Sequence, residues 1–113
     1  MQISQVEVVP VELNLRLPYR TAMHQEEITS IDCVFIRLET KDGRVAWGCA
    51  AFDPALTGES LEQVLRVCQA CADRSLDLNP LNTEFALAEL ASLTEDTPSA
   101  RCAFDIAFYD LLG

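Results

Sequence analysis

The chain has 113 residues, of which 50% are hydrophobic and 23% are charged, a composition typical of one globular domain near the commonest domain size. A chain of this length has room for a single hydrophobic core. Its formal net charge of -10, from 18 acidic against 8 basic residues, repels polyanions, so we expect no binding to nucleic acid or to an anionic membrane surface.

The sequence predicts neither export nor a membrane span. Glu7, Glu12 and Arg16 interrupt the apolar residues of the first twenty positions, which is unlike a secretory signal. No apolar run approaches the length that spans a bilayer. Five cysteines, an odd number, in a chain without an export signal are typical of free thiols in a reducing compartment. We therefore predict a cytoplasmic protein.

The amino-terminal segment predicts an edge strand with one irregularity. Apolar and polar residues alternate over Val11–Leu17, which is typical of a half-buried strand. Val6 and Val8 alternate in the opposite phase, and the change of phase falls at Val9-Pro10. Because proline lacks a donor for the sheet, we expect a bulge or a bend there.

Two further strands complete a predicted three-stranded antiparallel meander. Residues 31–40 and 45–51 are both rich in β-forming residues, and the Asp42-Gly43 turn between them is a strong hairpin signal because glycine adopts positive φ at little cost. One face of the first of these strands is apolar and is formed by Val34, Ile36 and Leu38.

The second half of the chain predicts helices, because the apolar period changes from two to 3.6 residues after Phe52-Asp53-Pro54. Ser60 and Gln63 have the spacing of a capping box at the start of the first helix. The helix that follows carries one apolar stripe, formed by Leu61, Val64, Leu65, Cys68 and Cys71.

Two more helices are predicted by one start signal, a polar capping residue followed by proline. Asn79-Pro80 begins a helix over residues 80–93, and Thr97-Pro98 begins a helix over residues 98–112. The last helix is apolar on nearly every side, so we expect it to need cover from more than one neighbour.

Cys68 and Cys71 have the spacing of half a zinc site or of a redox pair, but no second such pair follows. Both sulfurs fall on the apolar stripe of a predicted helix, where free cysteine packs as a small hydrophobe. We favour core packing and keep a thiol metal-binding domain as the weakest alternative.

The remaining chemistry-bearing residues give weaker signals. His24, the only histidine, lies in a polar stretch over residues 18–27 that is longer than a hairpin turn requires. Such a loop can bind a ligand, although a solvated histidine is the commoner case. The only lysine, Lys41, lies in the hairpin turn, which argues against a buried lysine base. We predict no catalytic residue and no metal site in this chain.

Three phrases resemble a known family. They are Leu17-Pro18-Tyr19-Arg20-Thr21, the strand and turn phrase TKDGRVAWG over residues 40–48, and ARCAFDIAFYDLLG over residues 100–113. They resemble the amino-terminal capping domain of the enolase superfamily, in the branch of muconate lactonizing enzyme and mandelate racemase. The last phrase, close to the family's A-R-x-A-x-D-x-A-x-x-D-L-x-G, is the most specific, and the resemblance covers essentially the whole chain.

The resemblance implies an α+β fold, a three-stranded antiparallel meander followed by a three-helix bundle, in one capping domain over residues 1–113. Residues 1–54 would form the sheet with its specificity loop, and residues 55–113 the helices. In that family the domain packs over the carboxyl-terminal end of a (β/α)₈ barrel, which is missing here. The barrel carries the acidic Mg²⁺ ligands and the bases that abstract a proton next to a carboxylate. The resemblance therefore implies no cofactor in this chain, Mg²⁺ in the full-length enzyme, and a small carboxylate substrate.

The resemblance also assigns two substrate-specificity loops, one after the first strand and one after the third strand. In relatives these loops approach the substrate, and here they map to Tyr19, Arg20, Thr21, Ala22, Met23, His24, Phe52 and Asp53. One departure stands out. The family's Gly-x-Gly-Glu is Ala46-Trp47-Gly48-Cys49 in this chain, so a thiol replaces a carboxylate.

We therefore predict the substrate-capping and specificity domain of a Mg-dependent isomerase or lyase, catalytically silent as an isolated chain. Dipeptide epimerase, N-acylamino acid racemase, o-succinylbenzoate synthase and cycloisomerase stay open, because the residues that separate them lie mostly in the barrel. The alternative from another class is a free-standing protein-interaction module.

We also predict a homo-oligomer. Three strands and two helices are not expected to cover every apolar side chain of the last helix, and the exposed ones would drive association. The side chains concerned are Ala103, Phe104, Ile106, Ala107, Phe108, Leu111 and Leu112.

Overall fold

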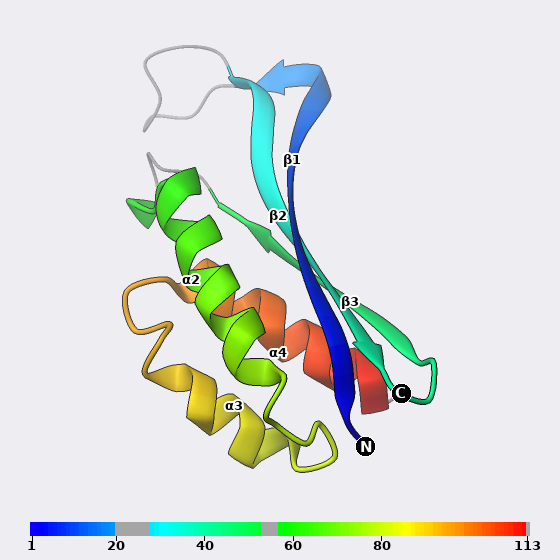
Figure 1. Ribbon diagram of the computed structural model, residues 1–113. Helices are drawn as coiled ribbons and strands as arrows, with labels where there is room; N and C mark the ends of the chain where they lie inside the picture. Colours follow the sequence, from blue (N-terminus) through cyan, green and yellow to red (C-terminus); the bar gives the residue numbers. More distant parts are fainter. Residues whose placement is uncertain (20–27, 53–56, 113) are drawn as a thin grey trace.

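The protein is described by a computed structural model that covers residues 1–19, 28–52 and 57–112, with residues 15–19 and 28–30 described by their backbone alone. One antiparallel sheet has the strand order β1-β2-β3 and is followed by three helices, as predicted (Figure 1). The elements are β1 (Ile3–Tyr19), β2 (Ile28–Thr40), β3 (Val45–Ala51), α2 (Leu61–Ser75), α3 (Thr83–Ala91) and α4 (Pro98–Leu112).

The core lies between the sheet and the helices. α2 packs against β1 and β2, α4 packs against β3 and β2, and α3 packs against the other two helices (Figure 1). The predicted apolar face of β2 is fully buried here, and Phe104 and Phe108 of α4 enter the same core. Ala103, Ala107 and Leu111 of α4 are also buried, so most of the apolar surface of this helix is covered within its own chain.

β1 continues through Val9-Pro10 in register with β2, so the predicted bulge at this place is wrong. The register shifts lie nearer its ends, between Ile3 and Gln5 and between Asn14 and Tyr19. β1 is nevertheless an edge strand, as predicted, and an edge strand tolerates a missing donor.

The apolar residues in the two halves of β1 lie on opposite faces of the sheet, which explains why a bulge was predicted. Val6 and Val8 pack against the core beneath the helices. Val11 and Leu13 alternate onto the other face, where Leu13 is exposed. A change of phase therefore reflects a change of buried face, and no extra residue is inserted.

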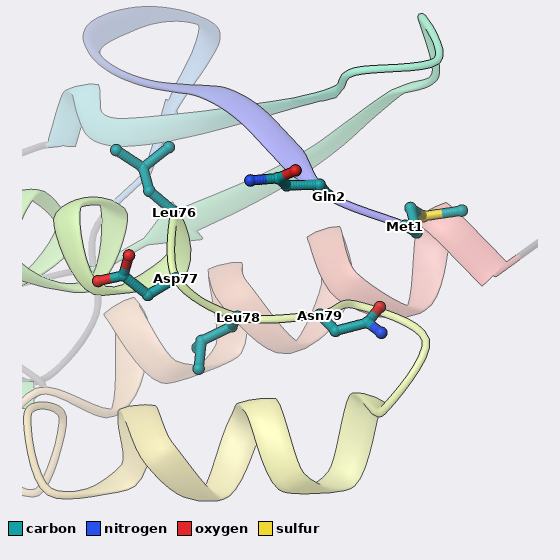
Figure 2. A pocket seen from close by; sticks show the side chains of 6 residues that line it. All are labelled: Met1, Gln2, Leu76, Asp77, Leu78 and Asn79. Atoms are coloured by element: carbon teal, nitrogen blue, oxygen red, sulfur yellow. The ribbon is translucent and has the colours of Figure 1, made fainter.

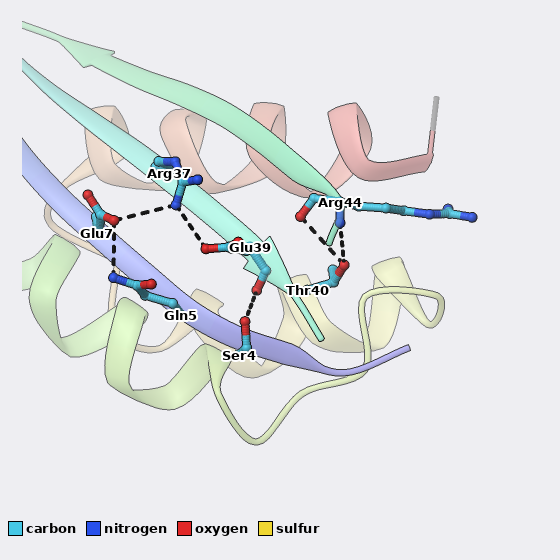
Figure 3. Close-up of polar contacts among 7 residues, drawn as sticks. All are labelled: Ser4, Gln5, Glu7, Arg37, Glu39, Thr40 and Arg44. Atoms are coloured by element: carbon cyan, nitrogen blue, oxygen red, sulfur yellow. Dashed lines mark hydrogen bonds and ion pairs between the residues drawn. The ribbon is translucent and has the colours of Figure 1, made fainter. Parts of the chain in front are cut away.

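The hairpin between β2 and β3 is closed by polar contacts that Figure 3 shows. Gly43 has a φ of +89°, as the predicted turn requires. The Thr40 hydroxyl accepts from the Arg44 N–H (3.0 Å) and donates to the Asp42 carboxylate. This bond from Thr40 is the main reason that the pKa of Asp42 is lowered.

A charged network crosses the sheet on the face away from the helices (Figure 3). Arg37 Nη1 on β2 lies 3.4 Å from a carboxylate oxygen of Glu7 on β1 and 3.1 Å from one of Glu39. All three side chains are partly exposed, so each pair contributes at most about 1 kcal/mol.

α2 begins at the predicted cap but lacks half of the predicted capping box. The Ser60 hydroxyl accepts from the Gln63 N–H (3.1 Å). The Gln63 amide group instead donates to the Asp96 carbonyl (3.1 Å) and to the Thr97 hydroxyl (3.2 Å). The side chain expected to close the box therefore ties the start of α2 to the residues before α4.

α3 is shorter than predicted, at Thr83–Ala91 instead of residues 80–93. The Asn79 side chain accepts from the Leu81 N–H (3.0 Å) and so forms a local turn where a helix cap was expected. The Thr83 hydroxyl donates to the Pro80 carbonyl within this turn (2.7 Å). α4, in contrast, has the predicted bounds.

α4 approaches the backbone of β3 very closely. A Cβ atom at Gly48 would lie 1.9 Å from the Ala103 carbonyl oxygen and 3.1 Å from the Ala107 Cβ. One carboxylate oxygen of Asp110 also accepts from the Trp47 N–H of β3 (3.1 Å). The small residues and the second aspartate of the phrase over residues 100–113 therefore fasten α4 to the sheet.

The glycine contact gives a ranked stability prediction. We expect Gly48→Ala to lower the free energy of unfolding by about 3 kcal/mol, because the added methyl group forces α4 off the sheet. Gly43→Ala is the control. It meets open space and should cost only about 1 kcal/mol for its positive φ. Urea denaturation of both variants checks the order, and an equal or smaller loss for Gly48→Ala would contradict it.

Candidate functional site

The segments that follow β1 and β3 leave from the same end of the sheet. In an antiparallel meander the first and third strands run in one direction, so Tyr19 and Ala51 end their strands on one side (Figure 1). The hairpin over residues 41–44 and both chain termini lie at the opposite end (Figure 1). The two predicted specificity loops are thus attached to a common edge of the domain.

The structure describes two of the predicted site residues. The backbone of Tyr19 pairs with Ile28 at the end of the β1–β2 ladder. Phe52 is 5% exposed and belongs to the hydrophobic core. The others lie outside the described residues, and their role stays a prediction. They are Arg20, Thr21, Ala22, Met23, His24 and Asp53.

Phe52 and Glu59 anchor the chain on the two sides of residues 53–56. Phe52 holds the first side through its place in the core. On the other side Gly58 has a φ of +76°, a conformation that glycine adopts readily, and the Glu59 N–H donates to the Thr57 hydroxyl (3.2 Å). The ends of this candidate loop are therefore held by the fold.

Glu59 is a structural residue beside the candidate loop that sequence analysis missed. Its side chain is 2% exposed, and its two oxygens accept from the Ser99 hydroxyl (2.8 Å) and the Ser99 N–H (3.1 Å). Ser99 lies in the first turn of α4, where N–H groups have no partner within the helix and a negative charge is favoured. The sequence offers one weak sign of this role, the position of Glu59 directly before the Ser60 cap. The contact itself could not be predicted, because Ser99 lies 40 positions further along the chain.

Cys68 and Cys71 lie in the core, which confirms the packing interpretation. Burial raises the pKa of Cys68 to about 12 and that of Cys71 to about 11. Both groups are therefore neutral thiols near pH 7, the form that suits an apolar environment.

In the parts of the chain that the structure describes, no group of three or more His, Cys, Asp or Glu side chains is arranged to hold a metal ion. Among the same residues, no helix is long and apolar enough to cross a membrane.

Two shallow hollows lie elsewhere on the molecule. One, of about 490 Å³, is bordered by Met1 and Gln2 and by the connection between α2 and α3, and so lies at the amino-terminal end (Figure 2). The other, of about 290 Å³, runs between α3 and α4 beside Leu87 and Tyr109. Asp105 borders the second hollow, and burial raises its pKa while nearby Arg101 opposes the shift.

Apolar side chains remain exposed along α4, and one of them, Tyr109, borders this second hollow. Ile106 and Leu112 are about half exposed, and Tyr109 is 54% exposed. Among the α4 side chains that were expected to be exposed, Ile106 and Leu112 are exposed. The others are buried, because α4 packs against the sheet, α2 and α3.

Comparison with known proteins identifies the domain. Residues 3–113 match the family described as mandelate racemase / muconate lactonizing enzyme, N-terminal domain. The chain is 31% identical over its whole length to the hydrophobic dipeptide epimerase of Enterococcus faecalis, of which it covers 31%. It is 32% identical to an L-Lys-D/L-Arg epimerase of Methylococcus capsulatus, of which it covers 32%. The chain thus spans about a third of the length of the curated relatives it matches.

Solved structures show the same fold. A dipeptide epimerase from Enterococcus faecalis, complexed with Mg and the dipeptide L-Leu-L-Tyr, superposes with a TM-score of 0.90 at 30% identity over 99% of this chain and 31% of that one. A dipeptide epimerase from Methylococcus capsulatus, complexed with Mg and L-Arg-D-Lys, gives a TM-score of 0.83 at 31% identity, again over 99% of this chain and 31% of that one.

The Glu59 contacts predict a stability cost on mutation. Glu59→Ala should lower the free energy of unfolding by about 2 kcal/mol, because it leaves the Ser99 N–H and hydroxyl without their partner. Glu62→Ala, at an exposed position in the first turn of α2, is the matched control and should cost less than about 0.5 kcal/mol. Urea denaturation measures both, and similar losses would mean that Glu59 does not anchor α4.

Proposed function

Because the chain belongs to the N-terminal domain family of mandelate racemase and muconate lactonizing enzyme, we propose that it caps the active site of a Mg-dependent epimerase or racemase and helps to select its substrate. The observation that carries the proposal is the common origin of the two candidate loops at one end of the sheet. A lid built from two loops on a rigid scaffold can shape a pocket and exclude water from it.

The proposal gives this chain no part in the chemical step. Its described residues do not offer the grouped carboxylates that hold Mg²⁺. We assign the metal ligands and the proton-abstracting base to a (β/α)₈ barrel outside this sequence. Mg²⁺ bound there would stabilise the negative charge that develops when the carbon next to a carboxylate loses its proton. The isolated chain is then catalytically silent.

For the substrate we propose a dipeptide or another N-acylated amino acid. The relatives at 31% and 32% identity are named as epimerases of hydrophobic dipeptides and of L-Lys-D/L-Arg. Such substrates share a carboxylate beside the carbon that is inverted and differ in their side chains. Residues 19–24 and Asp53 would contact those side chains and orient them, whereas Phe52, which was predicted to share this role, is buried in the core and holds the end of its loop. Because the five cysteines are all free, we further propose the reducing cytoplasm as the location.

A chimera tests the capping role. This chain replaces the corresponding third of the Enterococcus faecalis epimerase and is joined to the rest of that enzyme. We expect Mg-dependent dipeptide epimerisation by the chimera, with relative kcat/KM values for different dipeptides that differ from those of the parent. The chain alone should give no turnover above background.

Substitutions within the chimera locate the effect. His24→Ala and Asp53→Ala should change the ratio of kcat/KM between two dipeptides by about tenfold or less. Lys41→Ala, in the hairpin at the opposite end of the sheet, is the control and should leave the ratio unchanged. A folded, active chimera whose preference equals that of the parent and ignores both loop substitutions would rule out a specificity role.

We also propose that the chain self-associates through the exposed apolar side chains of α4. Each large apolar side chain that becomes buried contributes about 1.5–3 kcal/mol, against which the net charge of -10 acts. Analytical ultracentrifugation at micromolar concentration should find a dimer, and Ile106→Asp should return it to a monomer. Leu13→Asp, on the far face of the sheet, is the control. A monomeric parent chain would refute the proposal.

A further inference from the structure

The second hollow, between α3 and α4, has an apolar floor. Leu87, Ala88 and Ala91 line it from α3, and their spacing of one, three and four residues places them on one side of that helix. Because two of the three are alanines, the space between the helices is left unfilled. Its volume of about 290 Å³ is near the lower limit for a small-molecule site, so the hollow has room for a ligand of few atoms.

Charged and polar side chains border the same hollow. Arg101, Asp105 and Tyr109 recur every four residues along α4 and therefore lie on one face of it. Glu84 borders the hollow from α3. One guanidinium group, two carboxylates and one phenol group thus surround an apolar floor.

The charged groups of the hollow are not engaged elsewhere. Within the part of the chain that the structure describes, the side chains of Glu84, Arg101 and Asp105 make no hydrogen bond and no ion pair within 4.0 Å. Asp105 is half-buried, and this burial raises its pKa, while Arg101 opposes the shift. A cation bound beside this carboxylate would replace the solvation that it has lost.

We propose that this hollow binds a free α-amino acid with an apolar side chain, such as leucine. The ammonium group of the ligand donates to the Asp105 and Glu84 carboxylates, and its carboxylate accepts from the Arg101 guanidinium. Its side chain lies against Leu87 and Ala88. Arg101 and Asp105 are one helical turn apart, with Cβ atoms about 5–6 Å from each other, so two groups attached to one carbon atom can reach both.

A ligand with a single charge fits the hollow less well. An alkylamine would engage the two carboxylates but leave Arg101 without a partner, and a carboxylic acid anion would be repelled by Glu84 and Asp105. A zwitterion matches both signs of charge at once. This inference concerns binding alone and does not rest on the proposed function.

A titration of the isotope-labelled chain with L-leucine at neutral pH, followed by the chemical shifts of the backbone amides, tests the site. We expect saturable shifts confined to residues 84–91 and 101–109. The dissociation constant should be on the order of a few millimolar, because the hollow is shallow and the ligand small.

Three analogues of leucine test the recognition on the unsubstituted chain. Isoamylamine lacks the carboxylate, isocaproate lacks the ammonium group, and glycine lacks the apolar side chain. Each should bind about tenfold more weakly than leucine or worse, because each leaves one part of the hollow without its partner.

Substitutions separate the charges of the site from its shape. Asp105→Asn and Arg101→Gln each remove one charge, whereas Ala88→Leu fills the hollow and leaves every charge in place. Each should weaken leucine binding by about tenfold or more. Arg66→Gln, at an exposed position on α2, is the matched control and should leave the dissociation constant unchanged. Circular dichroism first verifies the fold of each variant, and the analogue series decides the matter should a variant fail to fold.

The opposite results are equally clear. Shifts that do not saturate, or that spread over the sheet and the first hollow, would overturn the proposal. So would equal affinity for leucine and for either singly charged analogue, or unchanged binding by the Asp105→Asn and Arg101→Gln variants. Because the readout is binding without turnover, a failure here leaves the proposed capping role standing, and an inactive chimera leaves this site standing.

Discussion

The contact between the backbones of α4 and β3 is the constraint on which the rest of this domain depends. With no side chain at Gly48, the Ala103 carbonyl can rest against the strand, and the Asp110 carboxylate then reaches the Trp47 N–H. This placement brings Phe104 and other large side chains of α4 into the core with β2. Any larger residue at the contact would separate the two layers. The most family-specific phrase of the sequence is therefore explained by packing rather than by chemistry.

The same helix connects the packing of the core to the candidate loop. Its first turn is capped by Glu59, which lies just after residues 53–56, and Gln63 of α2 binds the Thr97 hydroxyl before it. The bonds of Glu59 and Gln63 attach the chain that follows residues 53–56 to the start of α4, and α4 is itself attached to β3. The near side is fixed by Phe52 in the core. A loop held in this way keeps the position of its ends whatever residues lie between them.

Elements with one unambiguous local signal were predictable from the sequence. β3 and α4 have their predicted bounds, because the Asp42-Gly43 turn fixes the start of the strand and a proline stands at the first helical position. The start of α3 was misplaced because the Asn79 side chain bonds locally to Leu81 instead of capping a helix. Glu59 was missed for a different reason, since its partner is brought near only by the complete fold. The placement of both loops at one end followed from the strand order, but no local pattern states which of their side chains contact a ligand.

The described carboxylates show how structure and specificity are divided in this domain. Glu59 binds Ser99 of α4, Asp110 of α4 binds the Trp47 N–H of β3, and Glu7 of β1 pairs with Arg37 of β2, so these acids connect different elements. The predicted specificity residues 20–24 and 53 lie outside the described residues, and none of them is a partner in the bonds just named. Under the proposed function, substitutions at these positions would alter the shape and charge of a lid while leaving those bonds in place. Such a domain would change its substrate preference at little cost in stability, because the residues proposed to select the substrate differ from the acids that hold the elements together.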